Sequence, residues 1–232
     1  MSAPEAAGVE EAAERLSEGR ADEAARILEA HLLKRPDDRA AVNNLACCHL
    51  SLGRPEEALA LLEEAQRRWP EDACVANNLG FAHLQAGDAA RAESDFRRAL
   101  GLTPRDPETL NNLGLALATQ NRWAEAVGSY REALGALGAQ ADHPAASDLF
   151  NNLGCALRDL GTLAEAATAF RRALALSPFD PEIANNLGCT HLALGGLDEA
   201  ETVLAGAARL APEDAAIAEN LRRCRERMGG AA

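Results

Sequence analysis

The sequence predicts an all-α solenoid in which pairs of helices pack against their neighbours along the chain. The triplet Asn-Asn-Leu occurs five times, at 43–45, 77–79, 111–113, 151–153 and 185–187. The residue number rises by 34 from each copy to the next, except that it rises by 40 from the third to the fourth. A fixed period of this size is typical of a repeat array. Strong helix formers dominate, and no run alternates between apolar and polar residues as a strand would.

The period divides the chain into units of equal length when the Leu of each triplet is placed at position 7. The units are 5–38, 39–72, 73–106, 107–140, 147–180 and 181–214. Residues 141–146 form an insertion, and 215–228 are expected to form a cap helix. The first unit lacks the triplet, as terminal repeats often do. We therefore expect a single solenoid over residues 5–232.

Four positions of the unit have a clear physical purpose. Gly or Ala at position 8 and Ala at position 20 allow the two helices of a pair to approach closely. Gly at position 15, replaced by Asn121 in the fourth unit, can end the first helix in the left-handed conformation. Pro at position 32 stops the second helix. The acidic residues that tend to follow are expected to cap the next helix, at Asp37–Asp38, Glu71–Asp72 and Glu213–Asp214.

The unit resembles the tetratricopeptide repeat, whose pattern is W-x2-L-G-x2-Y, then A-x3-F and a closing Pro. The fifth unit shows this best, with Phe150, Leu153, Gly154, Gly161, Ala166, Phe170, Ala173 and Pro178 at the pattern's positions. The resemblance covers residues 5–214. It implies a right-handed superhelical solenoid of six helix-turn-helix repeats with a C-terminal cap helix. It also implies a concave groove lined by the first helix of each pair.

Asparagines are expected to form a row along that groove. Position 6 carries Asn44, Asn78, Asn112, Asn152 and Asn186, continued by Asn220, and position 5 carries Asn77, Asn111 and Asn151 nearer the edge. Asn is a mediocre helix former, so helix stability does not explain it. Its amide offers the same donors and acceptor as a peptide group and could hold an extended chain by its backbone. Phe81 and Leu115 at position 9 would add apolar contacts.

The row resembles the asparagine ladder in the tetratricopeptide superhelix of O-GlcNAc transferase, where asparagines hold client peptides. An alternative interpretation is that these asparagines bond neighbouring helices to each other instead. The acidic residues Glu108, Asp148 and Glu182 at position 2, with Arg158 as an exception, suggest that a ligand over the C-terminal half carries some positive charge. Positions 2, 5 and 6 of the middle units have no Lys or Arg, so a carboxylate clamp of the co-chaperone kind is not expected.

Charge and composition limit the classes of partner and location. The net charge of −13 disfavours nucleic acid and anionic membrane surfaces. The N-terminus does not read as a secretory signal, and no stretch is apolar enough to span a membrane. Six cysteines without a C-x-x-C arrangement read as reduced thiols. The sequence thus predicts a cytoplasmic protein.

No residues suggest catalysis, a cofactor or a metal site. Cys47, Cys155 and Cys189 share position 9, but equivalent positions of stacked helices are roughly 8–10 Å apart, which is too far for one zinc ion. His49, His83 and His191 at position 11 are interpreted as core residues, with no carboxylate partner expected beside them. We therefore expect a protein that is not an enzyme.

The sequence as a whole predicts a noncatalytic scaffold or adaptor that binds an extended or disordered segment of a partner protein. A monomer is favoured. Two alternatives are a self-associating structural protein and an accessory subunit of an enzyme complex that contacts its partners through edge loops, including residues 137–146.

Overall fold

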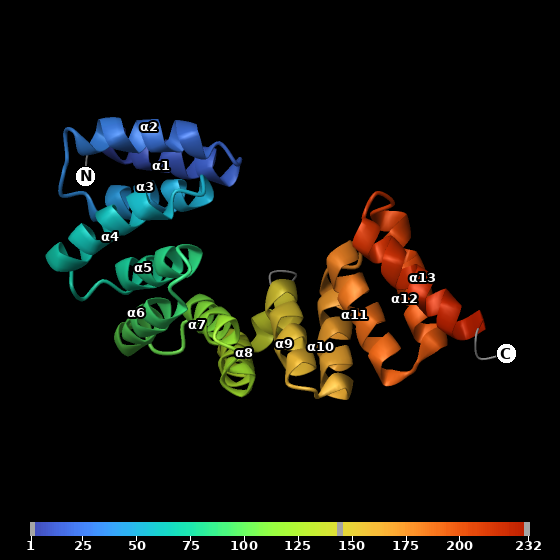
Figure 1. Ribbon diagram of the computed structural model, residues 1–232. Coiled ribbons are helices and arrows are strands. Elements are labelled where there is room, and N and C mark those ends of the chain that lie inside the picture. Colours follow the sequence, from blue (N-terminus) through green and yellow to red (C-terminus); the bar gives the residue numbers. More distant parts are fainter. Residues whose placement is uncertain (1–2, 143–145, 230–232) are drawn as a thin grey trace. The chain divides into compact units, whose positions relative to one another are not determined.

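The computed structural model describes residues 3–142 and 146–229, and within these ranges the chain forms thirteen α-helices and no strand (Figure 1). The all-α fold class is thus confirmed. The first helices of the pairs are α1 (Ala3–Ser17), α3 (Arg39–Ser51), α5 (Ala73–Gln85), α7 (Pro107–Thr119), α9 (Ser147–Asp159) and α11 (Pro181–Leu194). The second helices are α2 (Ala21–Leu32), α4 (Pro55–Arg68), α6 (Ala89–Leu102), α8 (Trp123–Leu137), α10 (Leu163–Leu176) and α12 (Leu197–Leu210), and α13 (Ala215–Gly229) follows them.

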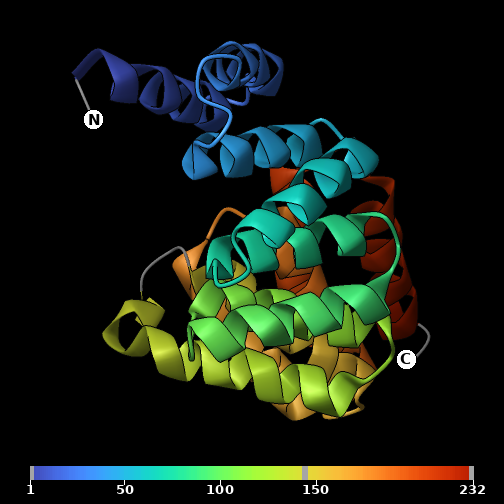
Figure 2. The ribbon, with the colours of Figure 1, turned by 90° about the vertical axis from the view of Figure 1, so that its left-hand side faces the viewer.

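The chain divides into two compact units, Met1–Ala116 and Leu117–Ala232, with the division inside α7. Within each unit, helices that follow one another along the chain lie in contact, as α1 to α6 and α8 to α13 do (Figures 1 and 2). Of the predicted insertion 141–146, residues 141–142 end a 3-10 segment, Gly138–Asp142, that follows α8. Residues 143–145 lie outside the described part of the chain.

Helix ends follow the chemistry expected from the sequence. Carboxylates accept backbone N–H bonds at the starts of four first helices and of the cap helix: Asp38 for α3, Asp72 for α5, Asp106 for α7, Asp180 for α11 and Asp214 for α13. Position 15 has positive φ in each of the middle units, including Asn121 at 60°. The short polar side chain of Asn adopts that conformation more readily than most residues other than glycine.

The close approach of the paired helices depends on position 8. A Cβ atom added to Gly154 would lie 2.6 Å from Cε1 of Phe170, and one added to Gly188 would lie 2.5 Å from Cγ of Leu204. Both contacts join position 8 to position 24 of the same pair. Position 20 is Ala in these pairs, and Ala166 and its equivalents have no solvent exposure. The small residues therefore set the spacing of the helices, as their pattern predicts.

Candidate functional site: the asparagine face

The first helices of neighbouring pairs also contact each other, as α3 does with α5 and α11 with α9 and α13. We use the name asparagine face for the surface that positions 5, 6 and 9 present in each unit, on α3, α5 and α7 in the first and on α9, α11 and α13 in the second. On this face the position 6 asparagine of one first helix meets the position 5 asparagine of the first helix in the preceding pair. The regular period of the repeat thus brings together asparagines whose residue numbers differ by 35.

Within the described residues of the two units, four hydrogen bonds connect successive first helices in this way, and we call them the rungs of the ladder. In each rung the position 6 amide donates through Nδ2 to the position 5 Oδ1 atom. The rungs are Asn78 to Asn43 at 2.8 Å, Asn112 to Asn77 at 3.1 Å, Asn186 to Asn151 at 3.2 Å and Asn220 to Asn185 at 2.9 Å.

The rungs bear out the interpretation that the asparagines bond neighbouring helices. Each rung is a neutral hydrogen bond, which stabilises a fold by about 0.5–1.5 kcal/mol net. It also fixes the orientation of two amides, since one N–H and one carbonyl lone pair are committed. An amide has two N–H donors and two lone pairs, so each asparagine retains hydrogen-bonding capacity beyond its rung.

Some of the remaining hydrogen-bonding capacity of the position 6 asparagines is used by cysteine thiols at position 9. Nδ2 of Asn78 also lies 3.3 Å from Sγ of Cys47, and Nδ2 of Asn186 lies 4.0 Å from Sγ of Cys155. Burial, with a smaller contribution from Glu108, raises the pKa of the Cys47 thiol. The thiols at position 9 are thus neutral groups that help to hold the position 6 amide.

The predicted binding residues differ in how far they reach solvent. Asn77 and Asn112 are buried, whereas the others are half-buried: Asn44, Asn78, Asn111, Asn151, Asn152, Asn186, Phe81 and Leu115. Phe81 packs partly against the core of the first unit. Asn44 is distinctive because its side chain makes no hydrogen bond within the described residues, since position 5 of the preceding helix is Val9. Its amide is therefore not used as a rung.

Sequence reasoning missed three participants on this face. Asn43 and Asn185 are the acceptors of rungs, and the difference of 35 in residue number between positions 5 and 6 of successive repeats could have identified them. Arg158, at position 12 of α9, donates from Nη1 to Oδ1 of Asn186 at 3.2 Å. The Arg158 side chain is long enough to reach α11, the first helix of the next pair. The repeat pattern alone gave no signal of this contact.

One expectation about the histidines was wrong. His83 does have a carboxylate beside it, because Nδ1 lies 2.8 Å from Oδ2 of Asp95 on the paired helix α6. Burial raises the pKa of Asp95, and the bond with His83 opposes that effect. The interpretation had overlooked that position 23 faces position 11 across a pair. In the preceding pair position 23 is Leu61, and Nδ1 of His49 is buried there with no hydrogen-bond partner among the described residues.

A metal site, a disulfide and a membrane-spanning helix each have requirements that the described residues do not meet. No three His, Cys, Asp or Glu side chains gather as a metal site in residues 3–142 and 146–229. All six cysteines are free thiols. In the same part of the chain, no helix combines the length and the apolarity needed to cross a bilayer.

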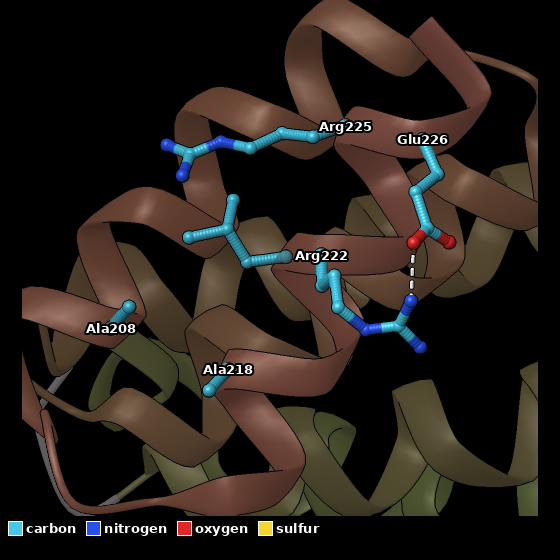
Figure 3. A pocket seen from close by; sticks show the side chains of 6 residues that line it. Ala208, Ala218, Arg222, Arg225 and Glu226 are labelled. Carbon is cyan, nitrogen blue, oxygen red and sulfur yellow. Dashed lines mark hydrogen bonds and ion pairs between the residues drawn. The ribbon is translucent and has the colours of Figure 1, made fainter. Parts of the chain in front are cut away.

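The outer side of α13 carries a shallow pocket lined by Ala208, Ala218 and Leu221, with Arg222, Arg225 and Glu226 around it (Figure 3). Arg222 occupies position 8, where the full repeats have Gly or Ala. Its guanidinium is held by Glu219 and Glu226.

Comparison with known proteins identifies the repeat. Two family models, both described as tetratricopeptide repeat, match the chain, one over residues 15–82 and 157–224 and the other over 77–141 and 128–181. A search of curated proteins gave no match.

Solved structures share the fold at low sequence identity. A chain of the APC/C hetero-tetramer Cut9–Hcn1 superposes with a TM-score of 0.85 at 22% identity, over 96% of this chain and 43% of that one. This protein therefore spans less than half of that chain's length. PilW, described as a widely conserved type IV pilus biogenesis factor, gives 0.83 at 20% identity, covering 95% of this chain and all (100%) of that one. YrrB, described as having an unusual peptide-binding site, gives 0.64 at 19% identity, covering 83% and 96%.

Proposed function

The chain belongs to the tetratricopeptide repeat family, whose repeats form scaffolds for protein–protein interaction, and we propose that its asparagine face holds an extended segment of a partner protein. In this proposal the protein is a noncatalytic, monomeric adaptor of the cytoplasm. The observation that carries the proposal is the ladder itself. In each unit it leaves half-buried amides in fixed orientations, and these match the donors and acceptors of a peptide backbone.

Preorganisation is the physical reason why such amides suit a ligand of varied sequence. A free asparagine side chain would lose rotamer freedom on binding, whereas one already held by a rung has lost it during folding. The hydrogen bonds of a peptide group do not depend on the side chain that follows it. The face therefore favours backbone recognition over the recognition of one particular sequence.

The spacing of the helices suits an extended chain. Packed helices lie roughly 8–10 Å apart, and a strand rises by about 3.3 Å per residue. Successive asparagines would thus meet about every third peptide group of the ligand. Half-buried Phe81, Leu115 and Cys155 at position 9 belong to the same face and would contact the side chains between those points.

Asn44 offers the sharpest test, because replacing it removes ligand chemistry without breaking a rung. A displayed library of random peptides of about 12 residues would be selected on the protein, and the affinity of selected peptides would be measured by fluorescence anisotropy. Loss of one neutral hydrogen bond in Asn44→Ala should weaken peptides that occupy the first unit by about 2- to 10-fold.

Asn121→Gly serves as the matched control, since it removes an asparagine from the end of a first helix, away from the face. Its affinity for the same peptides should equal that of the natural protein. If no peptide is selected, or if Asn44→Ala and related single replacements on the face leave every affinity unchanged, the asparagine face is not the binding site.

A further inference from the structure

The asparagine face of the second unit differs from that of the first, because an arginine is bound to one of its rung asparagines, Asn186. Its Nδ2 donates to Asn151 and lies near the thiol of Cys155, and its Oδ1 accepts from Arg158. Arg158 takes one of the two lone pairs of that oxygen, so a backbone N–H of a ligand is left with the other. A ligand at this point therefore meets a guanidinium beside the amide.

Arg158 retains donors after its bond to Asn186. A guanidinium has five N–H groups, and the bond to Asn186 uses one of them. The neighbouring carboxylate of Asp159 lies 3.6 Å from Nε, which is long for a hydrogen bond. The Arg158 side chain keeps 32% of its surface exposed, so a ligand can reach it.

A second arginine of this face, Arg223 at position 9 of α13, has no hydrogen bond or ion pair within the described residues. The other arginines of α13 are all engaged. Arg222 pairs with Glu219 and Glu226, Arg225 pairs with Glu201, and Arg227 donates to the carbonyl oxygen of Leu192. Arg223 is exposed and in position 9, the column that holds Cys155 and Cys189 in the two preceding first helices.

The guanidinium groups of Arg158 and Arg223 act on the same thiol. Cys189 lies on α11, between the helices that carry Arg158 and Arg223, and α11 contacts both of those helices. Burial raises the pKa of the Cys189 thiol, while the positive charges of Arg158 and Arg223 both act in the opposite direction. A neutral, half-buried thiol thus lies within the field of two arginines that come from opposite sides.

We propose that the asparagine face of the second unit recognises acidic residues of the bound segment, with their carboxylates paired to Arg158 and Arg223. This inference rests on the proposed binding of an extended segment. Carboxylates are the natural partners of guanidinium groups, because the planar fork of donors matches their two oxygens. The hydrogen bond to Asn186 also restricts the Arg158 side chain, so less rotamer freedom is lost when its guanidinium pairs with a carboxylate.

The acidic residues expected to attract positive charge lie elsewhere on these helices. Asp148 and Glu182, at position 2, begin α9 and α11, whereas Arg158 and Arg223 lie further along α9 and α13. Glu219 precedes Arg223 by one turn, but its carboxylate is held by Arg222. Asp159 is the exception, since its carboxylate lies 3.6 Å from Nε of Arg158. Arg223 has no such neighbour within the described residues, so an acidic side chain has its most favourable place between the two arginines.

Selection from the same displayed peptide library tests this inference. The library would be selected on the natural protein, on the Arg158→Gln, Arg223→Gln double variant, and on an Arg209→Gln, Arg225→Gln control. The control removes the same amount of charge from two exposed arginines and leaves Arg222 on Glu219: Arg209 is on α12, and Arg225 lines the pocket beside α13 (Figure 3). Circular dichroism would show that all three proteins keep their helices.

We expect Asp and Glu to be enriched in peptides selected on the natural protein and on the control, and not in those selected on the double variant. An acidic peptide from the first selection should bind the double variant on the order of tenfold more weakly, and its affinity should fall with added salt. Changing its acidic residues to Gln should cause a similar loss on the natural protein and little further loss on the double variant.

The outcomes separate the two proposals. Acidic enrichment that persists on the double variant would overturn this inference. Peptides that bind without acidic enrichment would overturn it too, while leaving the asparagine face as a backbone receptor. A natural protein that selects no peptide would overturn both.

Discussion

Replacing Gly154 by Ala should destabilise the second unit, although Ala is the better helix former. The added Cβ atom would lie 2.6, 2.7 and 2.9 Å from Cε1, Cδ1 and Cζ of Phe170. That ring is fully buried, so it has no free space into which to move. Overpacking of this kind costs about 1–3 kcal/mol, and the gain from replacing a helical glycine is about 1 kcal/mol. The net change should be a loss of up to about 2 kcal/mol.

Gly206→Ala isolates the steric part, because Gly206 also lies within a helix of the second unit and a Cβ atom there would meet nothing within 4 Å. This control should gain about 1 kcal/mol, so the two variants should differ by about 1–3 kcal/mol. Urea unfolding followed by circular dichroism gives that difference from the midpoints when the slopes agree.

Gly188→Ala should behave differently from Gly154→Ala. Its new Cβ atom would lie 2.5 Å from Cγ of Leu204, a smaller side chain than Phe170 but also fully buried, so α11 and α12 would have to move slightly apart. The second repeat already combines Ala46 at position 8 with a fully buried Leu62 at position 24. We expect Gly188→Ala to be close to the control in stability. If Gly154→Ala were as stable as Gly206→Ala, Phe170 would not set the spacing of α9 and α10 as argued.

Three further predictions concern turns, charges and rungs. Asn121→Gly should stabilise the protein by about 0.5–1 kcal/mol in urea unfolding, since φ of 60° is easier for glycine; a loss would contradict this. Burial of Asp38 opposes its ionisation, but the bonds from His31 and Ala41 outweigh that effect, so its pKa lies below the ordinary value of 3.8. Asp38→Asn should therefore cost about 1 kcal/mol near neutral pH, and the cost should disappear as the pH falls below 3.8 through the lowered pKa; unfolding midpoints that differ equally at all pH values would contradict this. Asn220→Ala removes the rung to Asn185 and should raise hydrogen exchange in α13 by about 2- to 10-fold, while exchange in the first unit stays unchanged.

The helices and their pairing could be predicted from the sequence because each depends on residues close together in a short period. Asp214 caps α13 through the backbone N–H groups of Ala216 and Ile217, and Gly161 ends α9 with φ of 88°. Gly154 and Phe170 belong to consecutive helices, so their contact follows from the pairing of those two helices. The period of the repeat shows all of these relations several times.

The contacts between repeats were harder to predict, because they depend on the rotation of one pair against the next. Counting around a single helix places Asn186 on one face, but it does not say that the amide reaches Asn151. The His83–Asp95 pair was missed for a similar reason, since it joins two helices and has no equivalent in the neighbouring repeat, where Leu61 stands at position 23. A side chain as long as that of Arg158 can also reach the first helix of the next repeat, and the repeat pattern does not show which group it contacts there.

The rungs give the repeated asparagines a role in folding, so their repetition alone does not identify a binding site. A rung needs Asn at position 5 of one repeat and position 6 of the next, so folding alone explains why the Asn-Asn pair recurs. Replacing Asn78 or Asn112 by Ala would remove a rung as well as a ligand group, and a weaker affinity would then have two causes. Binding chemistry is better sought where the pattern is broken. Asn44 has an amide without a rung, and Arg158 occupies the carbonyl of Asn186. These two departures separate the role of the asparagines in folding from their role in recognition.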